Sequence, residues 1–508
     1  MDKFIMKHQQ KINGQISSFD RLVFKGYLSF HYCQAVEWFL NHNNILLKDY
    51  RNFVNQHSQA IKQFGMDLAS RHGRQYIYLP RKVRKEEYVK AIAKREKITE
   101  GLICVLSCLE ENSSFAMRYG EGRPVLVSCR PKCLTLYFYF LDPVFGFIHI
   151  RLMTWLPYTM QICVNGHEWL AKSLEKAGIG FQKLENAFLT IDDFSKAQAI
   201  EKKFIRLDWP RILSRYAKVI NPLLKTTLQG MGYYWVIDQA EYSTDIIFKS
   251  GAELNPLYRK LEQYAVIGLR AEDIMTYLGR KMRGNFCGEI GNHFSKRWPG
   301  SRVKHRMKGN WIKMYDKHGR MLRVETVINR PYEFKVRRMG KRNGEQVMGW
   351  YPMAKRVSNM YRYAEVCMSA NRQYLDALSV VDDPSFVYKE LKNLCEPAKL
   401  NNRRKRGLNP LQKDDADLCA AVLHGEHFLH GFSNADFARR LGIKYSDDKK
   451  QRRRDSARVS RLLQLLRSHK LICKIAQTRK YRLTGWGVQT ISAIIYLREN
   501  ELPALLAA

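Results

Sequence analysis

The sequence predicts an α+β multidomain protein with an antiparallel sheet domain, a mixed helical and hairpin central domain, and a small C-terminal helical domain. The 508 residues are 45% hydrophobic, which is enough for one large core and for two or three domains. Short apolar runs typical of strands fill the first part, and amphipathic helical patterns dominate later. We therefore expect domains at residues 1–205, 206–395 and 413–508, with a basic Pro-, Asn- and Gly-containing linker at 396–412.

The first expected domain alternates helices with strands. Strand patterns occur at "GLICVLSCL", "PVLVSC", "CLTLYFYFL" and "FGFIHIRLMTW". A helix is expected at "GHEWLAKSLEKAG", ended by Gly178. Mostly antiparallel strands with helices on one side make an α+β sheet domain.

Charge is the strongest compositional signal. Lys and Arg total 86 against 48 Asp and Glu, a formal net charge of +38. Basic residues run along the whole chain, so a nucleic acid is the expected partner, DNA first and RNA as the alternative. A basic protein without a specific ligand would show the same composition.

Neither a membrane partner nor export is expected. The start "MDKFIMKHQQK" lacks the apolar core of a signal peptide, and no run of about 18 uncharged apolar residues occurs. Eleven scattered cysteines fit reduced thiols in a cytoplasmic protein. The spacings Cys104-x3-Cys108 and Cys129-x3-Cys133 lie in strand-like sequence, so zinc is disfavoured and buried core positions are expected. A homodimer is left open.

The last segment has a well-marked order of elements. Ser433 and Asp436 form a capping box for a second helix that Gly442 ends. The third helix, "QRRRDSARVSRLLQLLRSHK", turns Val459 and its leucines towards a core and its basic residues outward. Two short strands follow, with a basic tip from Gln477 to Lys480, and then a closing helix.

This order resembles the bacterial winged helix-turn-helix family, whose third helix enters the DNA major groove. A winged helix used for protein contacts is the alternative. Residues 449–458 carry six basic residues and one acidic residue, which favours DNA. The expected nucleic-acid-binding residues are Arg403, Arg404, Arg452, Arg453, Arg454, Arg458, Arg461, Gln464, Arg467, Arg479 and Lys480.

The segment "WIKMYDKHGRMLRVETVIN", Trp311 to Asn329, predicts a β-hairpin. A three-residue turn at 317–319 is expected, with Gly319 left-handed. That turn would place Tyr315 opposite Met321, Lys313 opposite Arg323, and Trp311 opposite Glu325. Because strand side chains alternate, one face of the hairpin would carry Trp311, Lys313, Tyr315, Arg323 and Glu325. Such a face suits a phosphodiester site, and it equally suits an exposed, salt-bridged sheet face.

Further carboxylates could hold a metal. In "YYWVIDQAEYSTDIIF", a helical turn after Val236 would make Glu241 and Asp245 i,i+4 neighbours able to share a divalent cation. Pairing with surface cations is the alternative. Asp20, at a strand end, is a further candidate ligand, whereas Asp142-Pro143 indicates a turn.

Two resemblances bear on activity. "IKMYDK" followed by "LRVE" resembles the YDK and R-x-E strands of rolling-circle replication initiators. Their His-hydrophobic-His metal strand has only "FIHIRL" as a counterpart, with His149 followed by Arg151. Together, "FDRLVFKG", "NGHEWLA", "YYWVIDQAEYSTD" and "KMYDKHGRMLRVETVIN" resemble a widespread, poorly characterised bacterial family linked to mobile elements.

Two functions therefore compete. One is a DNA-processing protein of a mobile element, a transposase, endonuclease or initiator, that cleaves or transfers phosphodiesters with Mg²⁺ or Mn²⁺. Glu325, Glu241 and Asp245 would hold the metal, Lys313 and Arg323 the phosphate, and Tyr315 would be a candidate nucleophile. The other is a non-catalytic binder, either a transcriptional regulator or an RNA-binding protein, with the hairpin as scaffold.

Overall fold

The computed structural model describes residues 2–120, 122–280, 290–296, 300–342, 344–381, 392–409, 412–423, 431–475, 478–496 and 498. The chain divides into two compact units, Met1–Ser379 and Val380–Ala508. The α+β class is confirmed. The expected boundary at residue 205 does not separate compact units, because one sheet runs through both sides of it.

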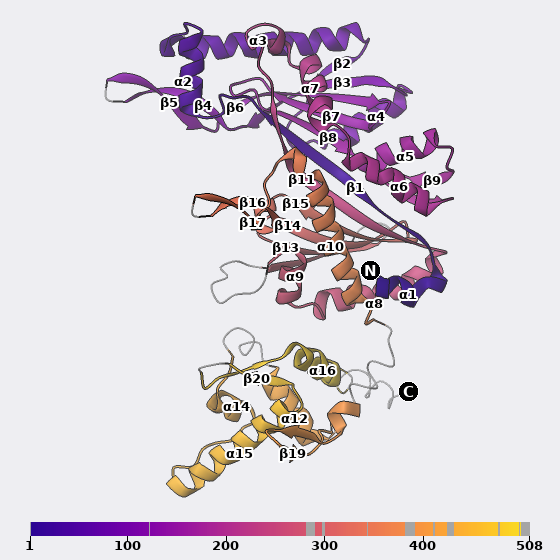
Figure 1. Cartoon of the computed structure of the whole chain (residues 1–508), viewed down its shortest axis with the longest axis vertical. Coiled ribbons are helices and arrows are strands. Elements are labelled where there is room, and N and C mark those ends of the chain that lie inside the picture. The colour runs from indigo at the N-terminus through magenta and orange to yellow at the C-terminus, as the bar shows by residue number, and fades with distance from the viewer. Residues whose placement is uncertain are drawn as a thin grey trace. The chain divides into compact units, whose positions relative to one another are not determined.

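The first unit is built on an 11-stranded sheet of order β12-β13-β14-β15-β11-β1-β8-β7-β6-β3-β2 (Figure 1). The pairing of β2 with β3 is parallel and the other pairings are antiparallel, so the sheet is mixed. Its strands are β1 (Ile12–Tyr27), β2 (Gln75–Tyr78), β3 (Gly101–Glu111), β6 (Lys132–Asp142), β7 (Gly146–Met153), β8 (Met160–Asn165), β11 (Tyr234–Phe248), β12 (Ile290–Lys296), β13 (Ser301–Met307), β14 (Asn310–Lys317) and β15 (Met321–Ile328).

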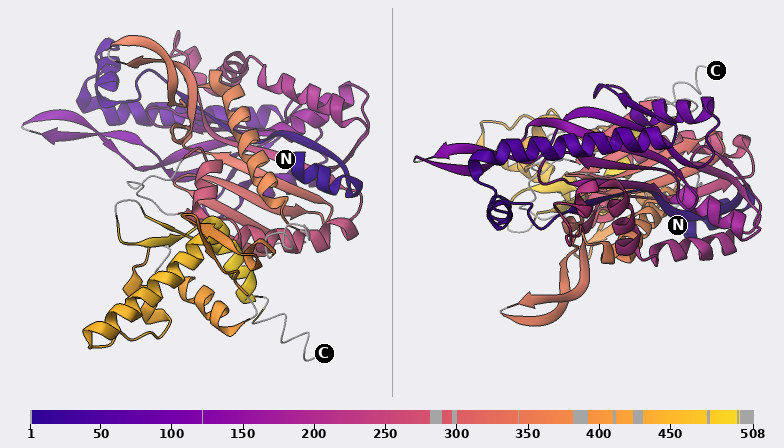
Figure 2. Two further views of the ribbon diagram at one scale, coloured as in Figure 1. Left: turned by 60° about the horizontal axis from the view of Figure 1, so that its bottom comes forward. Right: turned by 90° about the horizontal axis from the view of Figure 1, so that it is seen from above.

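Helices and small hairpins surround this sheet. The helices are α1 (Asp2–His8), α2 (Cys33–His42), α3 (Tyr50–Arg71), α4 (Lys85–Arg95), α5 (Gly166–Lys176), α6 (Phe194–Ile205), α7 (Trp209–Ile220), α8 (Gly251–Ile267), α9 (Ala271–Tyr277) and α10 (Met360–Leu378). The hairpins are β4 (Ser114–Gly120) with β5 (Arg123–Cys129), β9 (Phe181–Leu184) with β10 (Ala187–Ile191), and β16 (Lys335–Arg342) with β17 (Glu345–Pro352). Figure 2 shows that the strands of β4–β5 and of β16–β17 project from the unit.

The long strand β1 joins the two halves of the sheet, since β8 lies on one side of it and β11 on the other. Phe19 of β1 is fully buried, with its ring 5.0 Å from Tyr242 and 6.0 Å from Phe204 of α6. Burying an aromatic ring of this size stabilises the fold by about 1.5–3 kcal/mol. β1 therefore belongs to the core and is not an edge strand.

Helix α10 packs on β11 and β15. Its buried Asn371 donates to the Tyr242 carbonyl (3.1 Å) and accepts from the Thr326 hydroxyl (2.6 Å), so this polar contact fixes the helix on the sheet. Tyr363 and Tyr374 of the same helix are fully buried, so both belong to the core. Of the four cysteines expected in the core, Cys104, Cys108 and Cys133 are buried, whereas Cys129 is half-buried.

The second unit contains the hairpin of β18 (Ala398–Leu400) and β19 (Arg403–Lys405), followed by α12 (Lys413–Val422), α14 (Asn434–Arg440), α15 (Lys449–Ser468), β20 (Ile472–Lys474), β21 (Tyr481–Leu483) and α16 (Gly485–Tyr496). The capping box of Ser433 and Asp436 forms as expected, and Gly442 has a left-handed φ of 68°. The expected linker is folded instead, because it contains β18 and β19 and buries Leu408 in the core of this unit.

None of the described helices has both the length and the apolar character needed to cross a bilayer.

Candidate metal and phosphodiester site

The first structural feature of the site is a β-bulge in β1. Phe19 pairs with Tyr242 of β11 and Leu22 pairs with Ala240, so Asp20 and Arg21 both lie opposite the single residue Glu241. A bulge of this kind re-aims side chains and is common beside active sites. Asp20 lies on the same side of the sheet as Glu241, and the extra residue places Arg21 on that side as well.

Three carboxylates meet at this point. Asp20, Glu241 and Glu325 come from the adjacent strands β1, β11 and β15, and their oxygens lie within 4.8 Å of one another. Asp20 is 7% exposed and Glu325 is 1% exposed, whereas Glu241 is half-buried. The cluster therefore reaches solvent mainly through Glu241.

Strand β14 adds Lys313 and Tyr315. The structure pairs Lys313 with Glu325 and Tyr315 with Arg323, two residues away from the expected register. The cause is the turn: β14 continues to Lys317, which pairs with Met321, and His318 and Gly319 are both left-handed (φ 54° and 66°). Because the shift is two residues, each side chain keeps its expected face.

The two carboxylate oxygens of Glu325 differ in their hydrogen bonds. Its Oε2 accepts from the Tyr315 hydroxyl (2.9 Å) and from Lys313 Nζ (3.2 Å), which also donates to Glu241 Oε2 (3.4 Å). Its Oε1 is buried and receives no hydrogen bond from the described residues. Such an oxygen is satisfied by a proton held between the two carboxyl groups or by a bound cation.

The protonation of the pair follows from this packing. Burial and the charge of Glu325 raise the pKa of Glu241 to about 8. Burial also acts to raise the pKa of Glu325, but the Lys313 charge and the hydrogen bond with Glu241 outweigh it, so that pKa is lowered. At neutral pH the two groups share one proton, mainly on Glu241.

Arg323 and Asp245 form a buried ion pair. Arg323 Nε and Nη2 donate to the two carboxylate oxygens of Asp245 at 2.6 Å each, and Nη1 donates to Asp20 at 3.2 Å. Both residues are 0% exposed. Arg323 was expected to hold the phosphate, but its guanidinium is engaged by these buried carboxylates. Asp245 was expected to hold the metal, but it lies outside the carboxylate cluster.

The expected helical turn after Val236 is wrong, since β11 is extended through Phe248. Glu241 and Asp245 still share a face, because side chains four apart in a strand point the same way.

Asp20 is held by groups from a second layer. Asn165 and Asn186 donate to its Oδ1 (3.2 and 2.5 Å), and His167 Nδ1 lies 3.5 Å from the same atom. Burial acts to raise the pKa of Asp20, but the hydrogen bond with His167 and the charges of His167 and Arg323 lower it far below its ordinary value. Asp20 therefore stays ionised.

The sequence interpretation missed Asn165, His167 and Asn186 as site residues. Asn165 is the N-cap of α5, accepting from the Glu168 N–H, so "NGHE" signalled a helix start whose cap also serves the site.

The expected nucleic-acid-binding residues all lie in the second unit. Most are exposed, including Arg403, Arg404, Arg479 and Lys480, while Arg467 is half-exposed. Gln464 accepts from Lys405 Nζ at 3.0 Å. Gln477, at the expected hairpin tip, lies outside the described residues.

No protein family, curated protein or solved structure matches this chain.

Replacing Arg323 with Met should destabilise the protein by about 3–5 kcal/mol, because it leaves Asp245 and Asp20 buried without their cation. Urea unfolding of the full chain would measure this. The control is Arg306→Met on the neighbouring strand β13, where the side chain is exposed and a change within about 0.5 kcal/mol is expected. Equal stability of the two variants would contradict the role given to Arg323.

Proposed function

We propose that this chain is a DNA-processing protein that cleaves or transfers phosphodiesters with Mg²⁺ or Mn²⁺ held by Asp20, Glu241 and Glu325. The observation that carries the proposal is the convergence of three carboxylates from adjacent strands, one oxygen of each lying within 4.8 Å of the others. Hard divalent cations prefer all-oxygen ligand sets of this kind. A bound cation would polarise the phosphate and stabilise the charge that develops on its oxygens.

The residues around the cluster support such a reaction. Lys313 reaches two of the carboxylates and offsets their mutual repulsion. Burial and the charge of Glu325 raise the pKa of Tyr315 well above its ordinary value, so its hydroxyl keeps its proton. That hydroxyl already donates to Glu325, so Glu325 would accept its proton when the Tyr315 oxygen attacks phosphorus. The P–O bond to the sugar would break, and the leaving sugar oxygen would keep the electron pair and take a proton from water.

The charge and the second unit support DNA as the substrate. The net charge of +38 attracts a polyanion. Arg454, Arg458 and Arg461 are exposed along α15, while Val459, Leu463 and Leu466 of the same helix are buried. This division of faces, and the order of helices followed by a hairpin, suit a winged helix that docks α15 on DNA. The resemblance to a family linked to mobile elements suits a transposase, endonuclease or initiator.

A non-catalytic nucleic-acid binder is the second candidate. One observation favours it: Lys313 already neutralises part of the carboxylate cluster, as in a structural ion-pair network. In that case the site would hold the sheet together, and the basic second unit would bind DNA or RNA.

The first prediction from this proposal is metal-dependent cleavage. Full-length protein should cut labelled single- or double-stranded DNA with Mg²⁺ or Mn²⁺ and leave it intact with EDTA, as followed on a denaturing gel. Glu325→Gln should lower the rate at least about 100-fold, the usual cost of removing one charge-stabilising group. The exposed Glu100→Gln should cleave like the wild type. Intact DNA in every lane, with binding retained, would select the non-catalytic alternative.

Tyr315→Phe separates two mechanisms within that assay. A covalent protein–DNA band that is present in the wild type and absent in this variant would identify Tyr315 as the nucleophile. Cleavage that persists in the variant would identify water instead.

The second prediction concerns the pH dependence of metal binding. Glu241 holds its proton below about pH 8 and must lose it to become a ligand, so Mn²⁺ affinity should rise with pH. The rise should be about tenfold per pH unit from pH 6 and should level off above pH 8, as measured by calorimetry. In Glu241→Gln the affinity should be weaker and nearly independent of pH. A flat profile in the wild type would contradict this protonation scheme.

The third prediction tests α15. Arg458→Gln should weaken DNA binding and lower the slope of log affinity against log salt by about one, because one phosphate contact is lost. Fluorescence anisotropy at several salt concentrations would measure both. Lys413→Gln, an exposed change at the start of α12, should leave the slope unchanged. Identical slopes in the two variants would place the DNA away from α15.

A further inference from the structure

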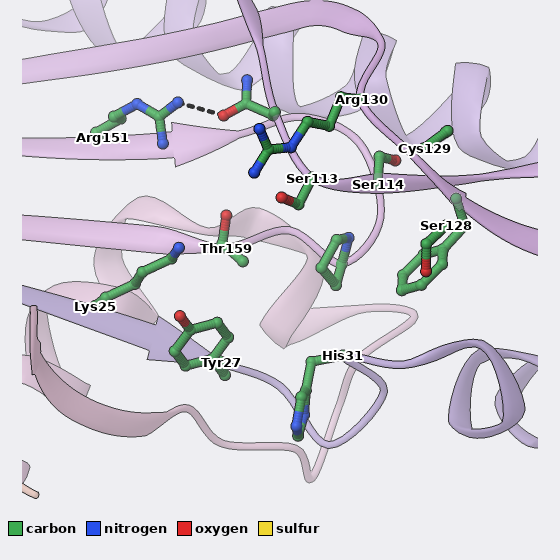
Figure 3. Close-up of a pocket in the computed structure, with 13 residues that line it drawn as sticks. Lys25, Tyr27, His31, Ser113, Ser114, Ser128, Cys129, Arg130, Arg151 and Thr159 are labelled. Atoms are coloured by element: carbon green, nitrogen blue, oxygen red, sulfur yellow. Dashed lines mark hydrogen bonds between the residues drawn. The ribbon is translucent and has the colours of Figure 1, made fainter. Parts of the chain in front are cut away.

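A second feature of the first unit is a pocket of about 510 Å³ that β1 and β7 line together with the segments beside β4 and β5. Lys25, Arg130 and Arg151 contribute positive groups, and Ser113 and Thr159 contribute hydroxyls. In Figure 3 the Lys25 ammonium points towards Thr159, and the Arg130 guanidinium lies beside Ser113. These groups therefore face one common space.

The charges in this pocket are unbalanced. Its lining contains no Asp or Glu. Arg151 pairs with Glu110 (3.1 Å) and donates to Asn112, so its charge is compensated. Within the described part of the chain, Lys25 and Arg130 have no carboxylate within 4.0 Å. Two positive charges are thus left facing the pocket without a counter-ion.

We propose that this pocket binds the phosphate monoester of a nucleotide, either free or at the end of a nucleic-acid strand. A monoester carries a charge of about −1.5 to −2 with three acceptor oxygens, which matches two uncompensated cations and neighbouring hydroxyl donors. A diester inside a strand carries only one charge. The charge balance therefore favours a terminal phosphate over an internal one.

The size of the pocket indicates more than a lone phosphate. Its volume lies within the range of about 300–1,000 Å³ typical of small-molecule sites. Tyr27 and His31 also line it, with ring centroids 5.8 Å apart. Aromatic side chains of this kind stack on nucleic-acid bases. A nucleotide unit fills such a space better than inorganic phosphate does.

The pocket and the carboxylate cluster share β1 and one face of the sheet. Arg21, Lys25 and Tyr27 are half-exposed and alternate with buried residues. Arg21, in the bulge, lies 3.5 Å from Glu86. Glu86 also lies 3.9 Å from His149, which shares its strand face with Arg151. Lys25 follows Asp20 by five positions in the strand, a span of about 16 Å. A strand end held in the pocket would thus lie within a few nucleotides of the cluster.

The proposal that the pocket binds phosphate does not depend on any reaction at the carboxylate cluster. Only the assignment of the bound phosphate to the nucleic-acid substrate rests on the proposed function. The two are therefore tested under different conditions.

The experiment measures binding of full-length protein in EDTA, where no metal-dependent cleavage occurs. Fluorescent single-stranded DNA ending in a 5′-phosphate, a 3′-phosphate or hydroxyls only is compared by anisotropy, and dTMP is compared with thymidine by calorimetry. A phosphate-ended strand, or dTMP, should bind at least about tenfold more tightly than its hydroxyl counterpart, the usual gain from charge-assisted hydrogen bonds. The double variant Lys25→Gln/Arg130→Gln should lose this difference.

The matched control is Lys176→Gln/Arg206→Gln, which removes the same charge from exposed positions on α5 and after α6. It should keep the phosphate preference, and melting curves should show all variants folded. A preference for phosphate-ended strands supports a strand terminus, and a preference for dTMP alone supports a free nucleotide. The proposal is overturned if neither preference exists, or if the pocket variant retains it. If the wild-type protein did not cleave DNA with Mg²⁺ or Mn²⁺ but kept its preference for phosphate, only the proposed function would be contradicted.

Discussion

The buried guanidinium of Arg323 is the interaction on which the site depends. It joins three strands, because Arg323 lies on β15, Asp245 on β11 and Asp20 on β1. Taking these charges out of water is costly, and the cost is offset because each of the three guanidinium nitrogens has an acceptor, including the Asn186 carbonyl at 2.8 Å from Nη2. The same contacts that hold β1 against β11 and β15 therefore also orient Asp20.

The carboxylates of Asp20, Asp245, Glu241 and Glu325 lie close enough to repel one another strongly when ionised. Nearby cations offset this repulsion to a different extent at each residue. Arg323 and His167 keep Asp20 and Asp245 ionised, and Lys313 does the same for Glu325. No described cation beyond Lys313 is bonded to Glu241, so this residue takes up the proton. Glu241 is also the most accessible member of the cluster. The group that must change protonation when a cation binds is thus the group nearest to solvent.

Local features of this protein could be predicted from sequence, and features that depend on distant contacts could not. The capping box at Ser433, the stop at Gly178 and the polar face of the β14–β15 hairpin follow from residues close together in the chain. The exact register did not follow, because His318 adopts a left-handed conformation that favours Gly or Asn. The boundary expected at residue 205 failed because β1 pairs with β11, more than 200 residues later. Asp20 was one candidate among several, since nothing within "SSFDRL" reveals a bulge opposite Glu241.

The bulge also explains why one strand can serve two sites. Without the extra residue, Asp20 and Lys25, which are five positions apart, would point to opposite faces of the sheet. With it, the carboxylate cluster and the cations of the phosphate pocket lie on one face of a continuous strand. A strand paired on both sides is rigid, so the distance between the two features is set by the sheet and does not depend on loop motion. A nucleic acid that engaged both would be positioned by the pocket before it met the carboxylates, which separates recognition of a strand end from the chemistry on its backbone.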